Sequence, residues 1–160
     1  MTLALVTGAP GWLGTRLVDV LRNGLEGIAE KSDRKIRCLV YPGSDSSALA
    51  NFGAEIVEGD VRDPAALEKL CEGAKGATLF HVAAIIHPTE GAKQFYEVNA
   101  KGTENVVAAA QRADIRRFVH VSSNSPIGTN PSKDHVFDED APYNPYMGYG
   151  KSKRLAELAV

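Results

Sequence analysis

Short apolar runs alternate along this chain with segments whose apolar residues recur at helical spacing. The runs at 3–6, 36–40, 54–58, 77–82 and 117–122 predict five strands. Helices are expected over about 11–23, 46–51, 64–72 and 93–113, and a last one from Tyr146 onward. Strands separated by helices favour the α/β class: a Rossmann-type, doubly wound parallel sheet of at least five strands with helices on both faces. No internal repeat or linker interrupts the pattern, so we expect one domain over residues 1–160.

Composition and charge narrow the functional class. The 160 residues are 44% hydrophobic and 24% charged, which is ordinary for a soluble globular protein. A net charge of -2 predicts neither a nucleic-acid partner nor an anionic membrane surface. Cys38 and Cys71 are isolated in apolar or helical contexts, which indicates two buried free thiols and a reducing, cytoplasmic location. The His and Cys spacing does not suit zinc, and we expect no metal site.

A glycine-rich turn joins the first predicted strand to the first helix. It reads T-G-A-P-G-W-L-G, with glycines three apart at 8, 11 and 14. Such glycines allow a tight turn, close approach of backbone to a pyrophosphate, and close helix–strand packing. The free N–H groups at the helix start attract phosphate. Because no G-K-[S/T] follows the last glycine, a Walker P-loop is excluded, and the alternative is a plain strand–helix turn. The predicted phosphate cradle comprises Gly8, Ala9, Pro10, Gly11, Trp12, Leu13 and Gly14.

The ends of the second and third strands bear on which dinucleotide would bind. Tyr41 follows the second strand, where an acidic residue would bind the ribose hydroxyls of NAD and an arginine the 2′-phosphate of NADP. Neither rule is met, and the absence of a cation between Tyr41 and Ala50 favours NAD over NADP. Asp60, after the third strand, is expected to accept a hydrogen bond from the adenine amino group. The alternative for Asp60 is a turn aspartate that caps local backbone.

Near the C-terminal end, Tyr149 and Lys153 stand four residues apart in the last predicted helix, so both side chains face the same side. A free tyrosine titrates near pH ~10, so a tyrosine that exchanges protons at neutral pH needs help in stabilising its phenolate. A lysine ammonium one helical turn away is the right kind of help. By themselves, an exposed tyrosine and a solvated lysine would be the simpler interpretation.

Six motifs in order resemble the short-chain dehydrogenase/reductase superfamily, in particular its extended, NAD-dependent epimerase/dehydratase and hydroxysteroid-dehydrogenase-like branch. They are T-G-A-P-G-W-L-G, G-D-V-R-D, H-V-A-A, V-N-A-K-G-T-E-N-V, V-S-S-N-S-P-I-G and Y-G-K-S-K. The resemblance implies an NAD(P)-dependent oxidoreductase or epimerase that acts on a small-molecule hydroxyl or carbonyl substrate. Sugar-nucleotide and hydroxysteroid substrates stay open alternatives.

The resemblance also implies residue roles. Tyr149 would be the general acid/base, Lys153 its partner and a ligand of the nicotinamide ribose, and Ser123 the donor to the reacting oxygen. Asn99 would support the active-site backbone. Together with Tyr41, Asp60, Tyr149 and Lys153, the implied cofactor contacts include four residues of the second and third motifs: Val61, Val82, Ala83 and Ala84.

Length is the departure from the family pattern, because extended members are about twice as long. We therefore expect the chain to be the N-terminal, cofactor-binding portion of a larger enzyme, with further C-terminal strands and the substrate lobe absent. Such a portion would have little turnover of its own, and a non-catalytic dinucleotide-binding module is the alternative function. The resemblance also implies a homodimer through the helices that start near Gln94 and Tyr146.

Overall fold

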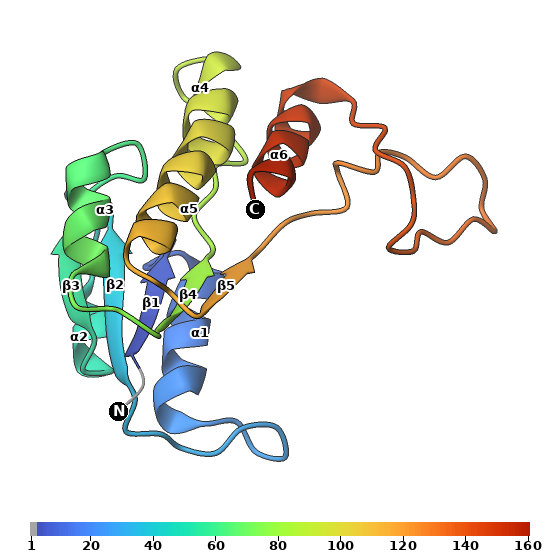
Figure 1. The fold of residues 1–160 in the computed structure, drawn as a ribbon. Helices are drawn as coiled ribbons and strands as arrows, with labels where there is room; N and C mark the ends of the chain where they lie inside the picture. The colour runs from blue at the N-terminus through green and yellow to red at the C-terminus, as the bar shows by residue number, and fades with distance from the viewer. Residues whose placement is uncertain (1–2) are drawn as a thin grey trace.

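The structure, a computed structural model, describes residues 3–160. Five parallel strands form one sheet in the order β3-β2-β1-β4-β5 (Figure 1). The strands are β1 (Leu3–Thr7), β2 (Lys35–Val40), β3 (Glu55–Glu58), β4 (Thr78–His81) and β5 (Arg117–His120). The predicted doubly wound α/β fold is confirmed. β5 ends at His120, two residues earlier than expected, because beyond it only Val121 N continues the pairing, to His81 O.

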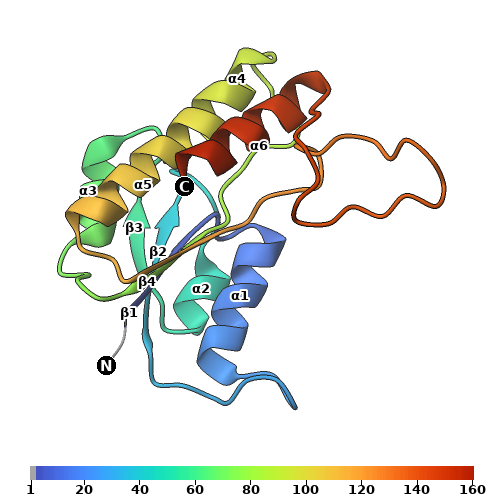
Figure 2. The ribbon, with the colours of Figure 1, turned by 45° about the vertical axis from the view of Figure 1, so that its right-hand side comes forward.

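Helices cover both faces of the sheet (Figures 1 and 2). One face carries α1 (Trp12–Asn23) and α2 (Ser47–Asn51). The other carries α3 (Pro64–Cys71), α5 (Gly102–Arg112) and α6 (Met147–Ala159), which lie side by side. The connection between β5 and α6 projects away from this body as a long loop.

Alternation along β1 explains the two layers of core. Ala4 and Val6 point to the face of α1 and α2, where they join Val18 and Leu49. Leu5 points to the opposite face and joins a cluster that includes Leu67 and Val106. Successive side chains of a strand point to opposite faces, so an unbroken apolar strand is what a sheet buried on both sides requires.

The helical segment before β5 differs from the prediction. A single regular helix was expected over 93–113, but the structure has α4 (Lys93–Phe95), a π-helical segment η1 (Tyr96–Lys101) and then α5. The π segment contains Asn99, one of the predicted site residues. Such π-helical turns are rare in proteins, and those that occur are often found at functional sites.

The chain order places a crevice at the carboxyl end of the sheet. β1 pairs with β2 on one side and β4 on the other, because the chain runs outward from β1 through β2 to β3 and then crosses back to β4 on the other side of β1. Ligands of open α/β sheets bind at such a switch point. Within residues 3–160, none of the helices is long and apolar enough to cross a bilayer.

Candidate active site

The carboxyl ends of the strands border a cavity of 780 Å³. This volume lies in the range of small-molecule and cofactor sites. Segments far apart in the sequence build its wall: the glycine turn, the ends of β2 and β3, the loop after β4, and α6. Every predicted cofactor contact lines it, namely residues 8–14, Tyr41, Asp60, Val61, Val82, Ala83, Ala84, Tyr149 and Lys153.

The glycine turn lies against the strand ends at distances that exclude side chains. Gly8 has φ +81°, and a Cβ there would stand 2.4 Å from the backbone nitrogen of Ala83. A Cβ on Gly14 would stand 2.5 Å from the Gly8 carbonyl oxygen. The Thr15 hydroxyl donates to the Pro10 carbonyl at 3.1 Å and holds the turn over the first helical residues. Glycine is therefore required here for packing as well as for the turn itself.

The N-terminus of α1 faces this cavity without a cap of its own. Its N-cap residue is Gly11, which has no side chain to accept from the first-turn amides. Trp12, Leu13 and Gly14 of that turn line the cavity. Uncapped amides at a helix start suit an anionic ligand, so this part of the site fits the pyrophosphate of a dinucleotide.

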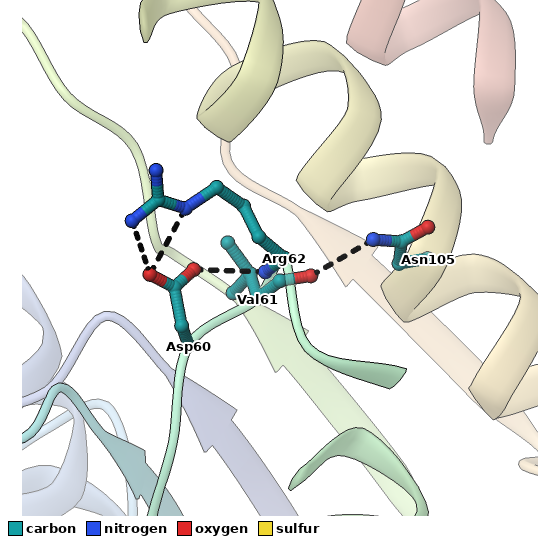
Figure 3. Close-up of polar contacts among 4 residues, drawn as sticks. All are labelled: Asp60, Val61, Arg62 and Asn105. Carbon is teal, nitrogen blue, oxygen red and sulfur yellow. Dashed lines mark hydrogen bonds and ion pairs between the residues drawn. The ribbon is translucent and has the colours of Figure 1, made fainter. Parts of the chain in front are cut away.

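At the β2–β3 end of the cavity, Asp60 and Arg62 form an ion pair (Figure 3). Arg62 Nε and Nη2 donate to Asp60 Oδ2 at 3.0 and 2.6 Å, and the Arg62 backbone N–H donates to Oδ1 at 2.8 Å. Burial alone would raise the pKa of Asp60, but the hydrogen bonds from Arg62 outweigh it and hold that pKa below its usual value. Asp60 thus both lines the cavity and caps local backbone, so its two predicted roles are compatible.

Two further contacts fix the turn after β3. Asn105 Nδ2 on α5 donates to the Val61 carbonyl at 3.2 Å (Figure 3). Asp63 accepts from the backbone N–H of Ala65 at 2.9 Å and caps α3, as the Asp63-Pro64 sequence suggests. These two hydrogen bonds therefore hold the backbone on both sides of Arg62 in place.

At the opposite, β5–α6 end of the cavity lie Tyr149 and Lys153. Lys153 is only 2% exposed. Its Nζ donates to the Val121 carbonyl at 2.8 Å and lies 3.4 Å from His120 Nε2. Burial lowers the pKa of Lys153 to about 8, against a smaller opposing influence of Glu157. Burial and the neighbouring Lys153 lower the pKa of His120 to about 4, so this imidazole is neutral and accepts from the ammonium.

The serines after β5 are arranged differently from the predicted pattern. Ser122 lines the cavity, and its hydroxyl donates to Glu157 on α6. Ser123 does not line the cavity; its hydroxyl pairs with that of Ser125 at 2.9 Å. The catalytic role predicted for Ser123 stays a prediction, and the structure does not bring this hydroxyl to the cavity wall beside Tyr149.

Beneath the cavity, the buried His81 of β4 bridges β1 and α5. Its Nδ1 lies 2.7 Å from Thr7 Oγ1 and its Nε2 lies 2.9 Å from Thr103 Oγ1. The Thr103 hydroxyl donates to the Asn99 carbonyl at 2.6 Å, so it accepts from an Nε2–H of His81. Thr7 Oγ1 accepts from Ala83 N–H at 3.3 Å and donates to Nδ1. Burial lowers the pKa of His81 to about 3, which keeps the ring neutral in this chain of bonds.

Asn99 is 1% exposed and supports the site from below rather than lining it. Its Oδ1 accepts from Ile85 N–H at 2.8 Å, and its Nδ2 donates to the Ile85 carbonyl at 3.0 Å. Nδ2 also reaches Ser152 Oγ at 3.1 Å, and that hydroxyl donates to the Tyr149 carbonyl at 2.7 Å. One amide therefore connects the loop after β4 with the helix that carries Tyr149 and Lys153.

A family model for the NAD-dependent epimerase/dehydratase family matches residues 4–160. The chain belongs to this family. The superfamily predicted from the six motifs is thereby confirmed, and the sheet order and switch-point cavity agree with it.

Curated relatives of this epimerase/dehydratase-family chain are longer than it is. It is 48% identical to the uncharacterized protein y4nL of Sinorhizobium fredii, over 99% of this chain and 45% of that protein. It is 34% identical to sterol demethylase protein B of Methylococcus capsulatus, over 98% of this chain and 45% of that protein. The chain thus spans less than half the length of these relatives.

The fold also matches a solved member of the superfamily. A short-chain dehydrogenase/reductase protein from Agrobacterium tumefaciens, solved with bound NAD, superimposes with a TM-score of 0.79 at 28% identity. The match covers 98% of this chain and 43% of that one.

Some of the wall escaped the sequence reasoning. Arg62 stands inside the G-D-V-R-D motif, but a cation was sought only directly after the second strand. Ile85 and Ile86, from the loop after β4, and Gln94, from α4, also line the cavity and were not among the predicted contacts. Across the part of the chain that the structure describes, there is no group of three or more His, Cys, Asp or Glu residues that could hold a metal ion.

Proposed function

We propose that this chain is an NAD(P)-dependent oxidoreductase or epimerase of the extended short-chain dehydrogenase type, with its dinucleotide in the 780 Å³ cavity. The observation that supports the proposal is the joint wall of that cavity: the glycine turn and the Tyr149–Lys153 pair border one space. Uncapped amides at α1 would hold the pyrophosphate, and Lys153 the nicotinamide ribose.

In the proposed reaction, the chain's own residues handle the proton. A bound nicotinamide supplies the acceptor or donor of a hydride at carbon. The Tyr149 oxygen takes the proton of a substrate hydroxyl while the carbon-bound hydride leaves, and the alcohol becomes a carbonyl; the reverse steps reduce it. Lys153, positively charged at neutral pH, stabilises the phenolate that accepts this proton.

For the substrate, we favour a lipophilic secondary alcohol or ketone of the hydroxysteroid kind over a nucleotide sugar. Apolar Ile85, Ile86 and Val98 line the cavity, and Lys153 is the one charged group at its β5–α6 end within residues 3–160. Similarity to sterol demethylase protein B points the same way.

Trp12 makes dinucleotide binding directly measurable. It is the one tryptophan of the sequence, lines the cavity and is 85% exposed. NADH absorbs where tryptophan emits, so titration with NADH should quench this emission and saturate. Trp12→Phe should remove the signal while calorimetry still detects binding. If neither method detects binding of NADH or NADPH, the proposal is wrong.

Tyr149→Phe separates an enzyme from a binding module. We expect the variant to bind NADH as the wild type does and to lose at least about 100-fold in turnover of any hydroxysteroid that the wild type oxidises, the loss typical of a missing acid/base group. NADH production at 340 nm measures that turnover. Binding without turnover in the wild type, over a panel of hydroxysteroids and nucleotide sugars, would favour the non-catalytic module.

A further inference from the structure

The β2–β3 end of the cavity carries a cation whose charge is already compensated. Of the described residues that line the cavity, three are charged: Asp60, Arg62 and Lys153. Lys153 lies at the opposite end, so Asp60 and Arg62 are the charged residues of the wall beside Tyr41 and Ser44. The carboxylates of Asp45 and Glu90 lie near that wall but not in it. The charges of Asp60 and Arg62 sum to zero at neutral pH.

The position of this pair matters for recognition of the ribose. Parallel β2 and β3 end at the same edge of the sheet, with Val40 opposite Glu58 and Gly59 N–H donating to the Val40 carbonyl at 2.9 Å. In Rossmann folds the 2′ position of the adenosine ribose is recognised at the end of the second strand. Here Tyr41 follows the strand directly, and the turn after β3 supplies the charged residues of the cavity wall at this end.

The hydrogen bonds of Arg62 commit one edge of its guanidinium to a carboxylate, which neutralises the charge that a phosphate would seek. Nε and Nη2, two donors of one edge of the guanidinium, both point to Asp60 Oδ2 (Figure 3). A 2′-phosphate would have to displace that carboxylate or stand beside it as a like charge. A free 2′-hydroxyl asks for neither. The Asp60 carboxylate keeps lone pairs for a neutral donor.

We propose that the Asp60–Arg62 ion pair makes this chain select NAD(H) over NADP(H), because the Asp60 carboxylate neutralises the arginine that would otherwise bind a 2′-phosphate and would repel that phosphate as a like charge. This inference rests on the proposed function, since it assigns a specificity to the same dinucleotide site. It also predicts a latent NADP site that appears when the pair is broken.

The test compares the dissociation constants of NADH and NADPH, read from Trp12 quenching, for the wild type, Asp60→Asn, Arg62→Ala and the double variant. The wild type should bind NADH at least about tenfold more tightly, a difference of about 1.4 kcal/mol. Asp60→Asn keeps shape and an acceptor but frees the guanidinium, so NADPH should gain about tenfold or more while NADH changes less than about threefold. The double variant should lose the NADPH gain.

Arg112→Ala is the matched control, because Arg112 is an exposed arginine that pairs with Glu68 outside the cavity. It should leave the NADH/NADPH ratio unchanged. Both ligands are measured on one preparation, so a smaller folded fraction alters both constants alike and not their ratio. An unchanged ratio in Asp60→Asn, equal affinities in the wild type, or a gain that persists in the double variant would overturn the inference alone. Binding of neither ligand would overturn the proposed function with it.

Discussion

The two ends of the cavity each hold one cation, and they hold it in opposite ways. Arg62 is 37% exposed and donates to the carboxylate of Asp60. Lys153 is 2% exposed and donates to a carbonyl and a neutral imidazole, with no ion-pair partner among residues 3–160. The arginine keeps its charge at any pH of interest, while burial lowers the pKa of the lysine to about 8.

Under the proposed function, this difference would separate recognition at Arg62 from reactivity at Lys153. A half-exposed cation in an ion pair, such as Arg62, changes the free energy of unfolding little and orients the carboxylate with which it pairs. A buried ammonium that has no ion-pair partner lowers stability, and other contacts of the fold must offset that loss. Buried polar contacts below that end stabilise the fold there. Asn99 connects the loop after β4 with α6, and His81 connects β1 with α5. Three changes break or sharpen the contrast.

Asn99→Ala should be the most damaging change, because it removes the support of the β5–α6 end. The N–H and carbonyl of Ile85 both lose their partner, and Ser152 loses a donor. Unpaired groups of this kind cost ~1–3 kcal/mol each, so we expect a loss of about 4 kcal/mol in the free energy of unfolding. Urea denaturation followed by circular dichroism measures it.

Asn105→Ala is the matched control, because Asn105 lies in α5, which directly follows the π-helical segment that contains Asn99. Asn105 Nδ2 donates to one carbonyl, that of Val61, at the half-exposed β2–β3 end. We expect a loss of about 1 kcal/mol. Equal losses for the two asparagines would mean that the two ends are supported alike, contrary to the contrast drawn above.

Alkaline pH should relieve the cost of Lys153. The pKa of this group is about 8 in the folded chain against 10.5 for an ordinary lysine, so between these values the unfolded chain binds more protons than the folded one. Stability contributed by this group must then rise as pH increases from about 8 to 10.5. The full effect on the free energy of unfolding is about 3 kcal/mol.

Lys153→Met isolates that effect from all other titrations. Below pH 8 the wild type carries the full cost, so the variant's advantage in unfolding free energy should be largest there and shrink toward pH 10.5. Lys151→Met, at an exposed position on the same helix, controls for the loss of one lysine. A difference between wild type and Lys153→Met that is flat with pH would show that the buried ammonium carries no such cost.

Most of the fold was predictable because its determinants are local. Apolar runs such as 3–6 and 36–40, and the glycines at 8, 11 and 14, predicted the strands and the cradle between them. The π-helical segment at Asn99 was not predictable, since a 3.6-residue periodicity does not reveal one wider turn. The Asn99 side chain within it bonds to Ile85 and Ser152, which lie 14 and 53 residues away in the sequence.

The residues of the candidate site that belong to sequence motifs were predictable. Those that line the cavity through the pairing of neighbouring strands were not. Tyr149, Lys153 and the glycine turn belong to motifs with fixed spacing. Arg62 follows β3, and it lines the cavity beside the end of β2 because these two strands pair in the sheet. The sequence order alone does not reveal that pairing. No motif marks His120, whose Nε2 faces Lys153 and whose Nδ1 is buried without a partner among the described residues.

Arg62→Ala should have the smallest effect on the free energy of unfolding. It therefore contrasts most clearly with Asn99→Ala at the other end of the cavity. An ion pair between half-exposed groups contributes ~0–1 kcal/mol, and the Asp60 carboxylate keeps its hydrogen bond from the Arg62 backbone N–H, so we expect a change within about 0.5 kcal/mol. The same urea titrations measure it. A loss above about 2 kcal/mol would mean that the pair is part of the scaffold like Asn99. A change in dinucleotide selectivity at unchanged stability is what a recognition element, unlike a structural one, must produce.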